Sequence, residues 1–122
     1  MLRLHGHRFH FLRRGLFQIL ILRVLYENPA HGYQIMNEIQ RITSGSYRPE
    51  PGAMYTTLRR MEARELVDSE WERKDSGADR RIYRPTTLGI SVLKEGLRMI
   101  KGSLRLVEDL IRFYDKHFAK NE

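Results

Sequence analysis

A chain of 122 residues, 41% of them hydrophobic and 30% charged, has the composition of one globular domain and not that of a disordered chain. It contains no cysteine, which excludes disulfides and thiolate metal sites. The formal net charge is +7, with nine basic and three acidic residues among the first 60, and this excess favours a polyanionic partner, either nucleic acid or an anionic membrane face.

Residues 1–13 combine arginines with His5, His7 and His10, and we expect them to form a loose N-terminal arm. They lack a continuous apolar stretch and a small-residue cleavage site, so we expect no signal peptide. No second cluster completes a coordination shell for the histidines, and neither a metal nor another cofactor is predicted. The apolar stretch 16–25 is shorter than the roughly 20 residues that cross a bilayer. These features together predict a cytoplasmic protein.

Three helices are predicted next. A helix over about 15–28 has a broad apolar face and ends before Pro29. A second helix over about 31–43 carries apolar residues at steps of three and four. Turn chemistry follows in Pro-Glu-Pro-Gly, and Pro51 or Gly52 opens a third helix that reaches about residue 65 with Met54, Leu58 and Met61 on its inward side.

The apolar period then changes from helical to two. Residues 66–73 and 80–84 are expected to form strands, and the polar segment 75–79 to form the turn between them. This pattern predicts a β-hairpin. Trp71 is the only tryptophan of the chain; we expect it to cover the core, and the alternative is a role in an aromatic ligand pocket.

Thr86 or Thr87 is expected to cap a long last helix over residues 87–122. Its apolar residues follow one another at steps of four and three, an unbroken seam of coiled-coil type: Leu93, Leu97, Ile100, Leu104, Val107, Ile111, Tyr114 and Phe118. Leu106, Leu110 and Phe113 add a second stripe. Since one helix cannot bury both stripes against a small head, we expect homodimerisation through the seam; the alternative is a core helix of one monomer.

Three helices followed by a hairpin predict a winged helix-turn-helix over residues 14–86. The fold class is thus mainly α with a small β-hairpin, plus a long C-terminal dimerisation helix. Because the major groove of DNA admits one α-helix, the third helix is expected to enter it while the hairpin lies along the neighbouring groove or backbone. The side chains expected to meet phosphates or base edges are hydroxyls and cations: Tyr55, Thr56, Thr57, Arg59, Arg60, Lys74, Arg80 and Arg81.

Structural alternatives exist for these residues, because Tyr55 could be packed in the core and the arginines could form a solvated face. The chain has no nucleophile elbow, Walker A loop, dinucleotide-binding glycine motif or zinc-protease motif, so we expect no enzyme. A winged-helix module that binds protein, and a non-specific architectural DNA-binding protein, remain as alternatives to a sequence-specific regulator.

Several motifs stand in a fixed order along the chain: Gly15, PAHGYQI (29–35), PGAMY (51–55), LRRME (58–62), RRIYRPT (80–86) and Gly89. In this order and spacing they resemble the PadR family of transcriptional regulators. The resemblance implies a homodimeric repressor of transcription that binds double-stranded DNA at a pseudo-palindromic promoter site. It also implies an effector, because members of the family often respond to small hydrophobic or phenolic compounds; no residue is assigned to it.

The resemblance adds Tyr33, Gly52 and Ala53 to the expected DNA contacts, and it implies a close approach at Gly32. Three positions depart from the family pattern. Thr56 replaces a proline that is common after the tyrosine, and it adds a hydroxyl. Ala53 replaces a small hydroxyl residue, which removes a contact to phosphate. Glu65 replaces the glycine at the turn into the wing, where a left-handed backbone costs about 1 kcal/mol more than with glycine.

Overall fold

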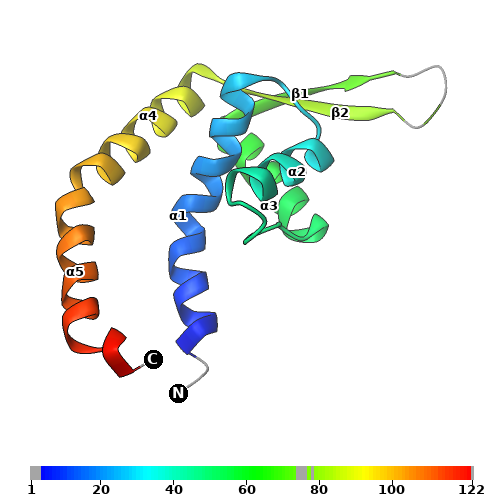
Figure 1. Ribbon diagram of the computed structural model, residues 1–122. Coiled ribbons are helices and arrows are strands. Elements are labelled where there is room, and N and C mark those ends of the chain that lie inside the picture. Colours follow the sequence, from blue (N-terminus) through cyan, green and yellow to red (C-terminus); the bar gives the residue numbers. More distant parts are fainter. Residues whose placement is uncertain (1–3, 74–76, 78, 122) are drawn as a thin grey trace.

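A computed structural model describes residues 4–73, 77 and 79–121, with the side chains of 15–73, 77 and 79–120. The elements follow in the order α1 (Leu4–Glu27), α2 (Gly32–Ile42), α3 (Pro51–Ala63), β1 (Val67–Glu72), β2 (Arg80–Pro85), α4 (Thr87–Gly102), α5 (Leu104–His117) and the 3-10 helix η1 (Ala119–Asn121). The first three helices form a head, the hairpin projects to one side, and α4 and α5 form an arm beside α1 (Figure 1). This arrangement confirms the winged-helix fold class.

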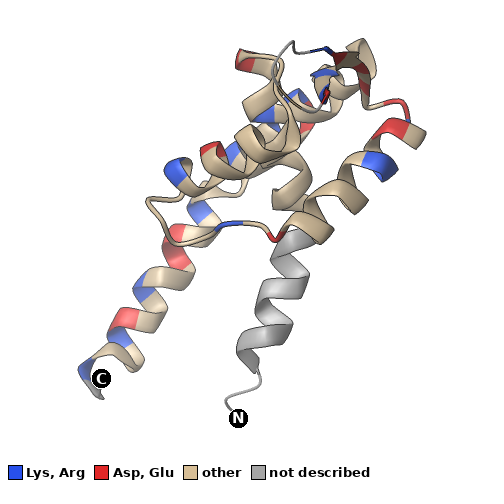
Figure 2. Cartoon of the chain, turned by 90° about the vertical axis from the view of Figure 1, so that its right-hand side faces the viewer, with Lys and Arg blue, Asp and Glu red and all other residues tan. Residues whose placement is uncertain are grey.

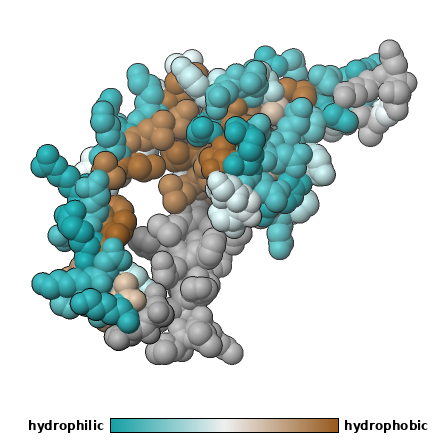
Figure 3. Space-filling view, in the orientation of Figure 1, coloured by the Kyte–Doolittle hydropathy of each residue, from teal (hydrophilic) through white to brown (hydrophobic). Residues whose placement is uncertain are grey.

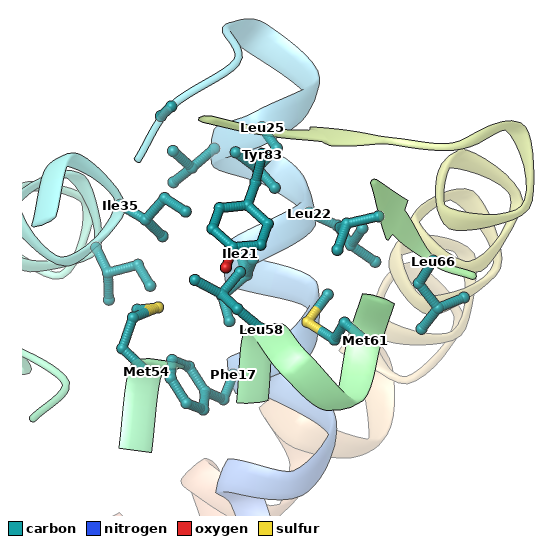
Figure 4. Close-up of a cluster of buried hydrophobic side chains, with 14 of the residues drawn as sticks. Phe17, Ile21, Leu22, Leu25, Ile35, Met54, Leu58, Met61, Leu66 and Tyr83 are labelled. Carbon is teal, nitrogen blue, oxygen red and sulfur yellow. The ribbon is translucent and has the colours of Figure 1, made fainter. Parts of the chain in front are cut away.

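The core lies where α1, α2 and α3 meet the base of the hairpin. Each helix contributes apolar residues of one face, at steps of one, three and four, that are no more than 1% exposed: Ile21, Leu22, Leu25, Ile35, Met36, Ile39, Met54, Leu58 and Met61. The inward stripe predicted for the third helix is therefore confirmed. Tyr83 of β2 enters this cluster from the hairpin (Figure 4).

Helix α1 begins at Leu4, whereas the sequence predicted a start near Gly15 and a loose arm before it. Its 24 residues contain no proline, and a glycine inside a helix costs only about 1 kcal/mol without breaking it. The predicted arm is thus wrong for residues 4–13, whose backbone is helical. Among the described residues, no helix combines the length and the apolar character needed to cross a membrane.

The hairpin is tied to the head through its backbone. Val67 pairs with Pro85 and Glu72 with Arg80 in an antiparallel register. The loop before α2 joins this ladder, because the Ala30 amide donates to the Tyr83 carbonyl at 3.1 Å and the Tyr83 amide donates to the Ala30 carbonyl at 2.9 Å. These two bonds fix β2 beside the start of α2.

The two ends of the hairpin are joined at one junction. Glu65 has φ of 62°, which confirms the left-handed turn expected there. Thr86 donates from Oγ1 to the Glu65 carbonyl at 2.6 Å, and the same oxygen accepts from the Gly89 amide, so Thr86 is the N-cap of α4. A Cβ at Gly89 would lie 2.0 Å from the Leu66 carbonyl oxygen, so only glycine allows this approach.

The last helix is broken, contrary to the unbroken helix that was predicted. It ends at Gly102 and resumes as α5 at Leu104. The Ser103 hydroxyl donates to the Met99 carbonyl at 2.9 Å, which is the back-bonding that bends helices, and Gly-Ser pairs are frequent sites of kinks. None of the residues of α5 is buried within the chain.

Replacing Glu65 by glycine should raise the free energy of unfolding by about 1 kcal/mol, because a left-handed backbone is strained for a residue with a Cβ. Urea denaturation measures the change. Arg64→Gly is the matched control: Arg64 has φ of −89°, so glycine there should give no gain. Equal stability of Glu65→Gly and the parent chain would show that the turn is not strained.

Candidate nucleic-acid interface

Helix α3 turns a polar face to solvent. With Met54, Leu58 and Met61 buried, the opposite side carries Gly52, Thr56, Arg59 and Ala63, flanked by Ala53 and Arg60, all of them exposed. Arg59 Nη2 donates to Thr56 Oγ1 at 3.4 Å, so a guanidinium and a hydroxyl stand together on this face. Thr57 is half-buried at the edge of the helix and presents less surface than its neighbours.

Helix α2 touches α3 through its first turn. A Cβ at Gly32 would lie 2.5 Å from Cε1 of Tyr55, which confirms the close approach expected at this glycine. Tyr55 is 38% exposed and so is not a core residue. Tyr33, the next residue of α2, is 57% exposed on the same side of the molecule. Two tyrosine rings thus border the exposed face of α3.

Arg48 belongs to this surface, although it is not among the residues predicted from the sequence. Its guanidinium carbon lies 5.3 Å from the centre of the Tyr33 ring, and its Nη1 donates to Gln40 Oε1 at 3.2 Å and to Asn37 Oδ1. These contacts hold the cation of the α2–α3 loop over α2. An arginine directly before the Pro-Glu-Pro turn was the signal that could have identified it.

His31 is the N-cap of α2 and faces the wing. Its Nδ1 accepts from the Gln34 amide at 3.3 Å, and Gln34 Oε1 accepts from the His31 amide at 3.0 Å, which forms a capping box. On the other side of the ring, Nε2 lies 3.0 Å from Nη1 of Arg80. A neutral imidazole accepts a hydrogen bond at only one of its two nitrogens. The Gln34 amide at Nδ1 and the Arg80 guanidinium at Nε2 therefore cannot both donate to the neutral ring.

The wing places Trp71 opposite Arg81 in the strand register. The Arg81 guanidinium carbon lies 5.3 Å from the centre of the indole, and its Nε donates to Ser69 Oγ at 2.7 Å. The expectation that Trp71 covers the core is wrong, because it is 61% exposed. The core side of β1 starts at Val67, and four residues of strand carry Trp71 roughly 13 Å further along the hairpin.

A hollow of about 660 Å³ lies between the start of α2, the side of α3 and the wing. It is lined by aromatic rings and charged groups: His31, Gly32, Tyr33, Tyr55, Arg59, Glu62, Trp71, Asp79, Arg80, Arg81 and Tyr83. The Glu62 carboxylate has partners within the chain: it accepts a hydrogen bond from Ser69 Oγ at 2.9 Å and lies 3.6 Å from the Arg81 guanidinium. Burial raises the pKa of the Tyr83 phenol, so this group remains neutral at physiological pH.

The structure thus brings Tyr33, Gly52, Ala53, Tyr55, Thr56, Arg59 and Arg60 together at one end of the head, and Arg80 and Arg81 lie at the outer end of β2, next to the turn of the hairpin. Lys74 lies outside the described residues. Basic and acidic positions are interspersed at this end of the molecule (Figure 2). Arg84, for example, lies 2.6 Å from Glu70 and so is paired within the hairpin. The surface therefore offers selected cations and hydroxyls instead of a uniformly basic patch.

The residues predicted for dimerisation lie on the α4–α5 arm. Leu93 is only 6% exposed because it packs into the core of its own chain, which removes it from a surface that a partner could reach. The other seven seam residues are between 41% and 54% exposed. Apolar side chains gather along the concave side of the arm (Figure 3).

The model of the family described as "Transcriptional regulator PadR-like family" matches residues 21–95, from the middle of α1 into α4. The chain belongs to this family. The match covers α2, α3 and the hairpin, and all the motifs except Gly15 lie within it.

Named relatives agree with the family. The chain is 36% identical over 95 residues to the transcriptional regulator Rv3488 of Mycobacterium tuberculosis. This match covers 78% of the chain and 85% of the relative. It is 28% identical over 107 residues to the transcriptional regulator YqjI of Escherichia coli, of which the match covers 88% of this chain and about half (48%) of the relative.

The fold is also found in solved structures. A PadR family transcriptional regulator from Eggerthella lenta superposes with a TM-score of 0.71 at 29% identity, covering 88% of this chain and 92% of that one. The family and these relatives are transcriptional regulators and not enzymes, as the sequence predicted. The chain is therefore a PadR-family transcriptional regulator.

Replacing His31 by alanine should lower the free energy of unfolding by about 1 kcal/mol, because the side-chain half of the capping box is lost. Thermal and urea denaturation measure the effect. His31→Asn is the matched control, since asparagine caps helices well and should restore most of the loss. An alanine variant as stable as the parent chain would show that the cap contributes nothing.

Proposed function

We propose that this regulator is a sequence-specific double-stranded DNA-binding repressor that acts as a homodimer in the cytoplasm. The observation that carries the proposal is the exposed polar face of α3. It presents Thr56, Arg59 and Arg60 on a helix whose opposite side is locked in the core. A helix of this kind fits the major groove, where guanidinium and hydroxyl groups read base edges.

The residues around α3 support this orientation. The groups on its two sides are suited to phosphates: Tyr33, Arg48 and the start of α3 at Gly52 and Ala53 on one side, and Tyr55, Arg80 and Arg81 on the side of the wing. The N-terminus of α3 adds the favourable field of a helix dipole towards an adjacent phosphate. With α3 in the major groove, the wing meets the flanking backbone.

Homodimerisation follows from the apolar face of α5. The apolar residues of this helix fill about half of its circumference, and the charged residues share the other half. A stripe this wide exceeds what a surface helix normally exposes, and within the described chain nothing buries it. A second copy joined along α4 and α5 supplies the missing cover. Two α3 helices then enter successive major grooves, about 34 Å apart, at a pseudo-palindromic site.

Repression follows in this scheme from occupation of the promoter. A small hydrophobic or phenolic effector at the dimer interface would release the protein by changing the distance between the two α3 helices. The coupling has to appear in both directions, as a change of DNA affinity on binding the effector and of effector affinity on binding DNA. A compound that binds without altering DNA affinity is not such an effector.

DNA binding is tested by fluorescence anisotropy with a duplex from upstream of the gene, scrambled competitor and a salt titration. We expect binding that survives the competitor and weakens steeply with salt. Arg59→Glu should weaken it by about tenfold or more, because an attractive contact becomes repulsive. Arg112→Glu, the same change on the polar side of α5, is the matched control and should bind as the parent chain does.

No binding at low salt would overturn the proposal in favour of a protein-interaction module. Binding that scrambled competitor abolishes would favour a non-specific architectural protein instead.

The dimer is tested by light scattering during gel filtration. The parent chain should elute with the mass of two 14.5 kDa chains. Ile111→Glu, at a position 54% exposed in the single chain, should leave the head folded and shift the mass towards one chain, because a charge is placed in the shared apolar face. Arg112→Glu should remain dimeric. A monomeric parent chain would contradict the dimer.

A further inference from the structure

Trp71 is an exposed aromatic residue whose position is fixed by its neighbours. Its indole is 61% exposed, and the Arg81 guanidinium is stacked over it at 5.3 Å. Arg81 is in turn held by Ser69 Oγ at 2.7 Å and by Glu62 at 3.6 Å. The indole is therefore oriented before any ligand arrives, while more than half of its surface stays in contact with water.

The hollow beside Trp71 has the chemistry to hold an organic phosphate. Its volume of about 660 Å³ is many times the roughly 30 Å³ that a water molecule occupies. The Tyr33 and Tyr55 hydroxyls and the Arg59 and Arg80 guanidiniums contribute hydrogen-bond donors. The carboxylates of Glu62 and Asp79 also line the hollow; Glu62 is paired with Arg81, and among the described residues neither carboxylate forms an ion pair with Arg59 or Arg80. Trp71 contributes a flat apolar wall on the hairpin side, which also carries Arg80.

The position of the hollow between α3 and the wing indicates what would occupy it when DNA is bound. It separates α3 from the wing. Two neighbouring grooves of a duplex are divided by a sugar-phosphate strand. When α3 lies in the major groove and the wing lies on the adjacent groove, one strand has to pass between them, through this hollow.

We propose that the hollow is the seat of one deoxyribose-phosphate unit of the DNA backbone, with Trp71 packed against the sugar and the Tyr55 hydroxyl and Arg80 bound to the phosphate. The inference rests on the DNA binding proposed above. Contacts to sugar and phosphate carry no base information. Trp71 therefore contributes to affinity for any duplex and not to the choice of sequence.

The single tryptophan makes the hollow directly observable. The intact parent chain is titrated with its upstream duplex while indole emission and its quenching by acrylamide are followed at constant salt. Occupation of the hollow should change the emission and lower the quenching constant severalfold, because the indole becomes covered. Anisotropy of a labelled duplex, recorded on the same samples, reports binding independently.

Variants test the energetic contribution. Trp71→Ala should weaken binding of the upstream and the scrambled duplex by the same factor, about tenfold, with the far-ultraviolet circular dichroism and the oligomeric mass unchanged. Tyr26→Ala is the matched control: Tyr26 is also 61% exposed but lies on α1 and does not line the hollow, so its loss should leave affinity unchanged.

The outcomes separate the two levels of the proposal. DNA binding with unchanged acrylamide quenching, or with parent-like affinity of Trp71→Ala, overturns the seat at Trp71 and leaves the DNA-binding function standing. A larger loss for the upstream than for the scrambled duplex overturns the sequence-independent role. No DNA binding at low salt overturns both the seat and the proposed function.

Discussion

The pair of backbone hydrogen bonds between Ala30 and Tyr83 determines how the wing sits on the head. A two-stranded hairpin alone is marginally stable in water. This bridge adds backbone hydrogen bonds beside β2, and the buried Tyr83 ring anchors the strand in the core. Because the bridge starts at the loop before α2, it fixes the wing relative to His31 and Tyr33. The hollow between α3 and wing is therefore shaped by the backbone, and surface side chains only line it.

A second junction fixes the base of the wing, where both strands meet the head. Glu65, Leu66, Thr86 and Gly89 form a junction in which a strained turn, a capping hydroxyl and a missing Cβ all serve one close contact. A glycine at residue 65 would relieve the strain, and the chain keeps glutamate there. The contact at Gly89 allows no such freedom, because a carbonyl oxygen occupies the place of its Cβ.

Element order, the inward stripe of α3 and the cap at Thr86 could be predicted from the sequence, because periodicity and capping are local properties. The missed features depend on tertiary context. The apolar repeat continues past Ser103 and therefore predicts one helix. The Ser103 hydroxyl, however, donates to the Met99 carbonyl, and the helix breaks there. Leu93 has the spacing of the seam but lies close enough to the head to be buried. The exposure of Trp71 follows from how far β1 extends beyond α3, which no residue pattern states.

The junction that anchors the wing also begins the arm, and this links the two surfaces. Thr86 bonds back to Glu65 while it caps α4, so the first turn of α4 cannot tilt without moving the root of the hairpin. Further along, a Cβ at Gly96 would lie 2.3 Å from Cδ1 of Ile19, so α4 and α1 are in close contact as well. A change of angle between two paired arms would thus reach α3 and the wing through packed helices instead of a flexible linker. The surface proposed to join two copies and the surface proposed to meet DNA are thus connected through Thr86 and the first turns of α4.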